Sequence, residues 1–149
     1  MKIGIIGKGF VGSAVQHGFS PNTGCDAEVR VYDKDPAKSQ HSLKNVLDNS
    51  DFLFLSLPTP SNLDGSINLD IVDDVLNDIN KLNKRNNIIL LRSTIIPGST
   101  RKFQEKYPKL SLVFNPEFLT ERSAKFDFIN QSRFIVGGNP EHVTKVADM

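Results

Sequence analysis

The sequence predicts an α/β fold in which a mainly parallel sheet of about six strands is doubly wound, with helices on both faces. Three observations support this prediction. Apolar, strand-length runs alternate with helix-length amphipathic segments from one end of the chain to the other. The strand runs are apolar at nearly every position, as expected for strands that are buried on both faces. A glycine-rich turn also joins the first strand run to the first helical segment.

Six segments have the composition of buried strands, since each is short, apolar and bounded by turn residues or by a helical segment. They cover residues 2–6, 28–32, 51–57, 88–91, 110–114 and 133–137. Gly7 ends the first of them, and turn-forming residues at 20–24 precede the second. Because helical segments separate these runs, right-handed crossovers would make most of the strands parallel.

Helical spacing of apolar residues marks the segments between and after the strands. These segments cover residues 10–19, 36–49, 68–82, 97–107 and 139–149, with one further short helix expected inside a loop at 115–128. Pro97 suits the first turn of its helix, and Asn139 followed by Pro140 is a typical helix start. Only about two turns follow Asn139, so we expect this last helix to be cut short.

Length and composition favour a single domain over residues 1–149 that lies in the cytoplasm. The chain carries 18 Lys and Arg and 17 Asp and Glu, a net charge of +1 that gives no reason to expect nucleic acid or an anionic membrane as partner. Its apolar runs are far shorter than the ~20 residues that span a bilayer. A single cysteine, Cys25, excludes an internal disulfide and fits a reducing cytosol.

The segment from Gly7 to Gly12 has the pattern G-x-G-x-x-G between a strand and a helix. Gly7 allows a tight turn, Gly9 leaves the backbone bare for close approach of a pyrophosphate, and Gly12 lets the helix pack closely on the strand. The amides of Phe10 and Val11 would lie at the helix N-terminus, which favours anionic phosphates. The pattern in this context predicts a Rossmann-type dinucleotide site, although glycines that serve only turn and packing are the simpler alternative.

Asp33 ends the second strand and follows the glycine pattern at the spacing expected for a carboxylate that binds the adenosine ribose. Such a carboxylate would repel a 2′-phosphate, so we expect NAD as the cofactor in preference to NADP. The neighbouring Lys34 and Lys38 weaken this preference.

Three further strand ends carry more polar and special residues than plain connections require: 56–60, 92–100 and 115–124. Ligands of open parallel sheets bind beyond the carboxyl ends of the strands. We therefore expect these segments to face the dinucleotide.

The same segments carry a resemblance. The order and spacing of 57–60 with the later Asp64 and Gly65, of 93–100 and of 115–119 resemble the UDP-glucose/GDP-mannose 6-dehydrogenase family from Met1 to about Gly138. The resemblance implies a nucleotide-sugar substrate whose carbon-6 alcohol is oxidised to a carboxylate with two NAD. It also implies an aldehyde, a cysteine thiohemiacetal and a thioester along the way.

By position, the resemblance implies that Glu117 is the base for the attacking water and that Thr94 helps to hold that water or the reacting oxygen. It assigns the backbone of Phe118 and Leu119 to the nucleotide sugar. The residues that it places along the cofactor are Leu57, Pro58, Thr59, Ser93, Glu121 near the nicotinamide and Lys38 near the adenosine.

Simpler alternatives exist for several of these residues. Glu117 and Glu121 fall in what can be a first helical turn, where the helix dipole favours acids. Ser93 and Thr94 can instead satisfy free amides at a helix start. Three histidines, His17, His41 and His142, have no metal-binding spacing and are expected to be structural or exposed, so we expect no metal site.

The cysteine nucleophile that the family uses lies in a later domain, and Cys25 precedes the second strand, away from the carboxyl ends of the strands. We therefore expect the chain to be inactive alone. Either it is the cofactor domain of a nucleotide-sugar dehydrogenase that works with the missing catalytic domains or a separate subunit, or it is a self-standing NAD-binding module without turnover. The cofactor domain of another dehydrogenase, such as a hydroxyacid dehydrogenase, is a third alternative, against which 115–119 argues.

Overall fold

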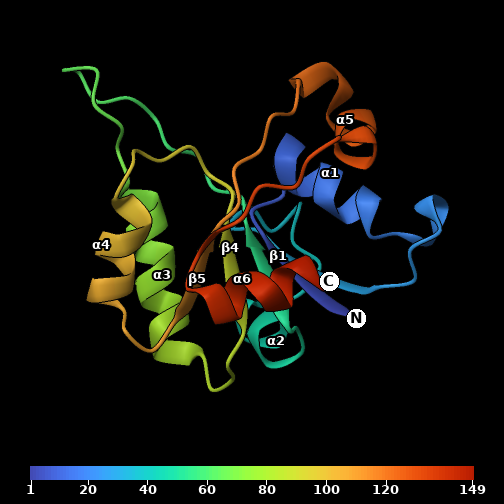
Figure 1. Cartoon of the computed structure of the whole chain (residues 1–149), viewed down its shortest axis with the longest axis horizontal. Coiled ribbons are helices and arrows are strands. Elements are labelled where there is room, and N and C mark those ends of the chain that lie inside the picture. The colour runs from blue at the N-terminus through green and yellow to red at the C-terminus, as the bar shows by residue number, and fades with distance from the viewer.

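The computed structural model describes all 149 residues and contains a six-stranded sheet with the strand order β2-β1-β3-β4-β5-β6 (Figure 1). The strands are β1 (Lys2–Ile6), β2 (Glu28–Tyr32), β3 (Phe52–Leu55), β4 (Ile88–Leu91), β5 (Ser111–Phe114) and β6 (Gly137–Gly138). The pairings among β1 to β5 are parallel, and β6 runs antiparallel to β5. The predicted mainly parallel sheet of about six strands is confirmed.

Helices cover both faces of this sheet, as a doubly wound fold requires. The core on one face is completed by α1 (Phe10–Gly18), α5 (Ala124–Asn130) and α6 (Pro140–Ala147). The core on the other face is completed by α2 (Leu43–Asp48), α3 (Asp70–Leu82) and α4 (Ser99–Lys106). Short 3₁₀ turns occur at η1 (Pro21–Thr23) and η2 (Glu121–Ser123). Six α-helices and one sheet thus form three layers.

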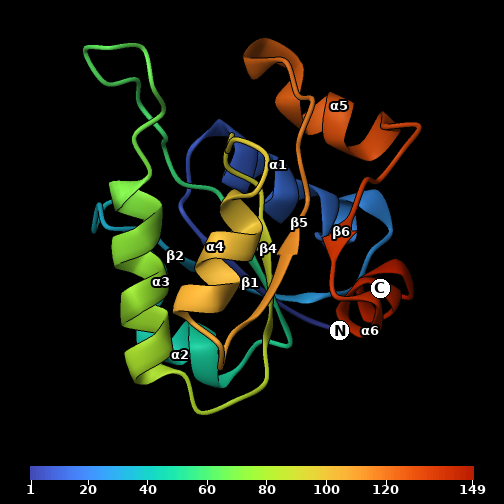
Figure 2. The same ribbon diagram turned by 60° about the vertical axis from the view of Figure 1, so that its left-hand side comes forward.

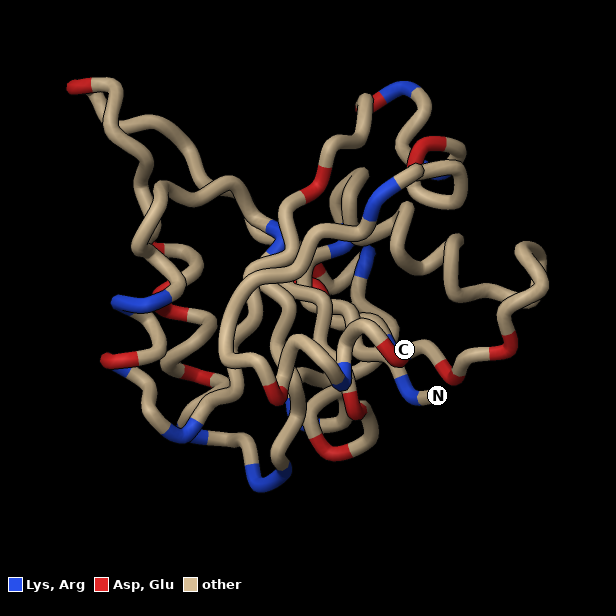
Figure 3. The backbone as a smooth tube through the Cα atoms, in the orientation of Figure 1, with Lys and Arg blue, Asp and Glu red and all other residues tan.

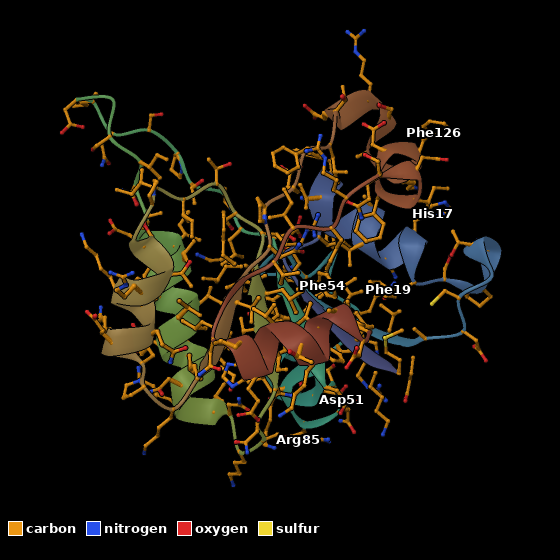
Figure 4. The ribbon with its side chains drawn as sticks, viewed as in Figure 1. His17, Phe19, Asp51, Phe54, Arg85 and Phe126 are labelled. Carbon is orange, nitrogen blue, oxygen red and sulfur yellow. The ribbon has the colours of Figure 1, made fainter.

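Strand β3 shows why the strand runs are apolar without alternation. Leu53 and Leu55 belong to the cluster under α2, α3 and α4, whereas Phe54 belongs to the cluster under α1, α5 and α6, and all three are fully buried. The ring of Phe54 lies 5.4 Å from the ring of Phe19, measured between centroids (Figure 4). Because both faces are covered, alternating polar positions would place unpaired polar groups in a core.

The topology also fixes where a ligand can bind. Strand β1 lies between β2 and β3. Helix α1 connects β1 to β2 over one face of the sheet, and α2 connects β2 to β3 over the other face. The carboxyl ends of the parallel strands meet at the upper edge in Figure 2. An open α/β sheet binds its ligand at such a switch point, outside these ends.

Two segments rise beyond this edge, the loop from 56 to 69 and the stretch from 115 through η2 (Figures 1 and 2). Lys and Arg are mixed with Asp and Glu along the whole trace (Figure 3). The helices of this chain are all too short or too polar to cross a membrane.

Two helices, α4 and α2, begin later than predicted. Helix α4 begins at Ser99, after Gly98 in the left-handed region at φ 90°, so Pro97 precedes the helix instead of opening it. Helix α2 occupies only the second half of 36–49, because Ser42 caps it by accepting a hydrogen bond from the Asn45 amide.

The predicted strand at 133–137 was wrong for most of its length. Strand β6 contains only Gly137 and Gly138. The side chains of Phe134 and Ile135 are exposed, and the Ile135 carbonyl accepts a hydrogen bond from the side-chain amide of Asn115 at 2.8 Å. The apolar composition of this segment, next to glycine, was therefore not sufficient evidence for a buried strand.

The outer edge of β2 is covered near its carboxyl end by the segment that follows it. The amides of Gln40 and His41 donate to the Val31 carbonyl at 3.1 and 2.9 Å. In return, the Val31 amide donates to the Nδ1 of His41 at 3.3 Å, and the Asp33 amide donates to the Ser39 hydroxyl at 3.1 Å. His41 thus has a structural role, as its lack of acidic or metal-binding partners indicated.

Candidate functional site

A cleft of about 920 Å³ opens at the carboxyl edge of the sheet, between the glycine loop, the ends of β2, β3 and β4, and α3. Twelve of the residues predicted for the site line it: Gly7, Gly9, Phe10, Val11, Asp33, Lys38, Leu57, Pro58, Thr59, Ser93, Thr94 and Glu117. A second hollow of about 870 Å³ between α4 and α6 is lined by none of the predicted site residues. The first cleft is therefore the candidate site.

Gly7 and Gly12 are glycines because their surroundings leave no room for a side chain. Gly7 has φ +95°, and a Cβ there would lie 2.2 Å from the Ser56 carbonyl oxygen. A Cβ on Gly12 would lie 2.0 Å from the Gly7 carbonyl oxygen. Real Cβ contacts are never so short, so these two positions hold the loop, the helix and β3 together.

Gly9 is different, because a Cβ at this position would meet nothing within 4 Å. Gly9 directly precedes α1, its backbone is extended, and no side chain caps the first turn of the helix. The first amides of a helix lack intrahelical partners and favour an anion. A bare backbone beside free amides is what close approach of a pyrophosphate requires, so the residues present fit a dinucleotide.

Asp33 is half-buried where β2 ends and already holds the glycine loop in place. One carboxylate oxygen accepts a hydrogen bond from the Lys8 amide at 2.6 Å, and the other accepts one from the Asp35 amide at 2.8 Å. Each oxygen keeps a further lone pair, so the carboxylate can also accept hydroxyl hydrogens. Lys38 lies 3.7 Å from the Asp35 carboxylate, in an exposed ion pair.

Ser93 links the ends of β3 and β4, since its hydroxyl accepts a hydrogen bond from the Leu57 amide at 3.0 Å. The alternative in which this serine caps the following helix is wrong, because Gly98 precedes α4 and no side chain caps it. Thr94 is exposed and lines the cleft.

Glu117 is half-buried on the wall of the cleft. Its carboxylate accepts a hydrogen bond from the Leu119 amide at 2.8 Å. Glu117 precedes η2 and is not in a helical turn, as its simpler alternative role required, whereas Glu121 does lie in the first turn of η2. Phe118, Leu119 and Glu121 do not line the cleft. The side chain of Phe118 is 75% exposed, and Glu121 is exposed in η2.

Helix α3 supplies a wall of the cleft that the sequence patterns did not reveal. The cleft residues of this helix are Ile71, Asp74, Val75, Asn77 and Asp78. Ile71 and Val75 belong to the apolar stripe of this helix, yet Ile71 is 39% exposed. Their spacing places them at the edge of that stripe, and this position is the sequence signal that could have indicated that they face a ligand.

Arg92, which follows β4, also lines the cleft and is 2% exposed. Its Nη1 donates to the side-chain oxygen of Asn115, and its guanidinium carbon lies 5.9 and 5.5 Å from the ring centroids of Phe54 and Phe128. Burial lowers the pKa of Arg92 to about 10, an effect that the negative charge of Glu117 opposes. The guanidinium is still protonated at neutral pH.

Cys25 is half-exposed and does not line the cleft. No group of three or more His, Cys, Asp or Glu side chains is arranged to hold a metal ion. The cleft therefore presents amides, hydroxyls and carboxylates over a buried cation.

Comparison with known sequences gives a consistent result. The family model described as UDP-glucose/GDP-mannose dehydrogenase family, NAD binding domain, matches residues 38–149. The UDP-glucose 6-dehydrogenase of Campylobacter jejuni is 32% identical over 92% of this chain and 42% of its own length. That of Haloferax volcanii is 26% identical over 95% of this chain and 42% of its own length. This chain thus spans about two fifths of these relatives.

Solved structures share the fold along almost the whole chain. A GDP-mannose dehydrogenase from Pseudomonas aeruginosa matches with a TM-score of 0.82 at 20% identity, and a UDP-glucose dehydrogenase from Pyrobaculum islandicum matches with 0.82 at 23% identity. Each match covers 99% of this chain and 43% of the other. The fold, the family match and the identity to a relative together show that this chain belongs to the UDP-glucose/GDP-mannose dehydrogenase family, in which it is the NAD-binding domain.

Proposed function

We propose that this chain provides the cofactor half of a nucleotide-sugar 6-dehydrogenase, which oxidises the carbon-6 alcohol of a nucleotide-bound hexose to a carboxylate with NAD. One observation carries the proposal: a single cleft is lined by the glycine loop, by Asp33 and by Thr94 and Glu117. A site for cofactor binding alone needs the first two features and has no use for a carboxylate and a hydroxyl at the far end.

Each end of the cleft has a distinct task in this proposal. Gly9 and the first amides of α1 receive the pyrophosphate, and Asp33 accepts the ribose hydroxyls. The nicotinamide supplies the hydride-accepting chemistry when NAD is bound. At the other end, Glu117 takes a proton from the attacking water and Thr94 orients that water by hydrogen bonding. Glu117 would have to release the Leu119 amide, or share its second oxygen, to do so.

The nucleotide sugar would approach along Phe118 and Leu119. The 75% exposure of Phe118 supports a role in contact with another group. Glu121 would join the nicotinamide end only after the loop around η2 moves toward the cleft. The single cysteine and the nucleotide cofactor fit a chain that works in the reducing cytoplasm.

A self-standing NAD-binding module is the second candidate function, and the position of Cys25 favours it. A thioester route needs an activated thiolate beside the hexose, and Cys25 lies in the connection before β2, outside the cleft. In the first candidate function the thiolate comes from another domain or subunit.

Calorimetric titration of the chain with NAD and NADP, followed by UDP-glucose and GDP-mannose on the NAD-saturated protein, tests these proposals. We expect saturable NAD binding, much weaker NADP binding and a further heat signal from one nucleotide sugar. NAD binding without any response to either nucleotide sugar would favour the self-standing module. Absence of NAD binding would contradict the cofactor site itself.

A further inference from the structure

Arg92 carries a buried charge whose position the fold alone does not explain. It directly follows β4, next to the end of β3, on the side of the sheet where Ile88, Leu90 and Phe54 belong to one core cluster. Its Nε and Nη2 are buried and have no hydrogen-bond partner, and neither does the neighbouring hydroxyl of Ser56. No carboxylate lies within ion-pairing distance of it. Unpaired buried charge is costly, so a role at the site is a better explanation than packing.

The surroundings of Arg92 hold the charge still. Asn115 fixes one end of the guanidinium, and the rings of Phe54 and Phe128 flank it at cation–π distances. Asn115 is itself fixed by the Ile135 carbonyl. The guanidinium therefore cannot swing out to meet a ligand, and it acts on the cleft through its electric field.

The field acts at a defined end of the cleft. Asp33 and the glycine loop lie at the adenosine and pyrophosphate end, and Arg92 lines the same cleft together with Ser93, Thr94 and Glu117. A dinucleotide extends across the switch point of such a sheet, so its nicotinamide half lies at the end where Arg92 is. Oxidised nicotinamide carries a positive charge that the reduced form lacks.

We propose that Arg92 sets the preference of the site for NADH over NAD, because its fixed positive charge disfavours the oxidised nicotinamide and leaves the neutral reduced ring unaffected. This inference rests on the proposed function, since it needs the nicotinamide to occupy this end. The consequence for a dehydrogenase is that the bound cofactor is a stronger oxidant than the free one. Glu117 opposes the effect with its negative charge, so the two residues tune the balance together.

The test compares the affinities of this chain for NAD, NADH and ADP-ribose, which lacks the nicotinamide, in the wild type and in Arg92→Met. Methionine fills the space between two aromatic rings without a charge. We expect the ratio of NADH affinity to NAD affinity to fall about tenfold, the size expected for two unit charges roughly 12 Å apart at an effective dielectric constant near 20. ADP-ribose affinity corrects for any effect of Arg92 on the pyrophosphate.

A second variant keeps the test decisive if Arg92→Met does not fold. Asn115→Asp places a carboxylate of the same shape against the guanidinium and cancels its charge, so the ratio should again fall. Arg92→Lys retains the charge and should keep the ratio within about threefold of the wild type, although it loses the planar contacts. A purely structural role would change the affinities for all three ligands together.

The possible outcomes distinguish a failure of this inference about Arg92 from a failure of the proposed function. If the wild type binds NAD and ADP-ribose but the folded variants keep its ratio, Arg92 does not set the preference. If the wild type binds none of the three ligands, the proposed function fails, and this inference fails with it.

Discussion

The two ends of the cleft are built by different means. At the end for which we propose adenosine binding, backbone geometry fixes the structure: glycines that admit no Cβ hold the loop, and the Asp33 carboxylate accepts hydrogen bonds from two backbone amides. At the β4–β5 end, side chains do the work: Ser93 binds a backbone amide, Arg92 binds Asn115, and Asn115 binds the Ile135 carbonyl.

This difference has a physical reason. Pyrophosphate and ribose are the same in every NAD molecule, so a rigid backbone cradle suits them. In the proposed function, the other end would orient a substrate and hold charges, and side chains offer that chemistry. It follows that substitutions at the adenosine end should act through steric overlap and lost ligand contacts, whereas substitutions at the other end should act through hydrogen bonds and charge.

The sharpest contrast lies within the glycine loop. Gly12→Ala should lower the free energy of unfolding by about 3 kcal/mol, because its Cβ would overlap the Gly7 carbonyl oxygen. Gly9→Ala should leave the free energy of unfolding within about 0.5 kcal/mol of the wild type, since its Cβ points into open space. Urea unfolding measures both, and equal stability of the two variants would break the distinction between packing and ligand-facing glycines.

Asn115→Ala should lower the free energy of unfolding by about 2 kcal/mol, because it removes one buried and one partly buried hydrogen bond and leaves the Arg92 guanidinium without its acceptor. The matched control is Asn62→Ala in the exposed loop before α3, which should change the free energy of unfolding by less than about 0.5 kcal/mol. Chemical denaturation measures the free energy of unfolding of both variants. A cost as small as that of the control would mean that the β4–β5 end does not depend on this hydrogen-bond chain.

Asp33→Ala should weaken NAD binding by about 1–2 kcal/mol, since the ribose hydroxyls lose their acceptor. Lys44→Ala in α2 is the control outside the cleft, and its exposed ion pair with Asp48 predicts an effect on NAD binding below about 0.5 kcal/mol. Calorimetry gives both affinities. An unchanged affinity in Asp33→Ala would remove this carboxylate from the ribose site.

The smallest effect is expected from Asp127, which holds the loop after Glu117. Hydrogen bonds from the Thr120 amide and the Ser123 hydroxyl keep the pKa of this carboxyl below its usual value. Because the pKa is lower in the folded state, the stabilisation is fully present above the unfolded-state value of about 3.9 and is lost as the pH falls through the folded-state value. Hydrogen exchange at the Thr120 amide should therefore accelerate, beyond its intrinsic pH dependence, in that acidic range.

The Asp127→Asn variant should not show this additional acid-induced change, because asparagine does not titrate. If the amide exchanges with the same pH dependence in both proteins, Asp127 does not anchor the loop through its charge.

The same contrast explains what the sequence could predict. Strands such as β1 and the glycine loop follow from local rules: apolar runs, glycine spacing and a terminal acid. Twelve predicted residues line one cleft, because parallel strands bring their carboxyl ends together. The glycine pattern and the terminal acid predicted five of them, and the resemblance named the other seven. The roles of Glu117 and Thr94 came only from the resemblance and remain predictions.

Tertiary packing decided the rest. The short β6 depends on how far β5 extends beside it, and an apolar run cannot reveal that. The exposure of Ile71 depends on where α3 lies across the cleft, which helical spacing does not fix. Arg92 could have been suspected as a charge at the end of an apolar run, but its two aromatic neighbours come from distant parts of the chain.

The cover on the outer edge of β2 has a consequence for how the molecule behaves in a crowded solution. An open edge strand offers unpaired amides and carbonyls on which another chain can build, and this is a route to aggregation. Here, Gln40 and His41 occupy the polar groups of Val31, and the opposite edge ends in a strand of only two glycines. The sheet therefore offers little template for strand addition at the carboxyl end of β2 or beyond β6, so edge-to-edge association should be disfavoured there.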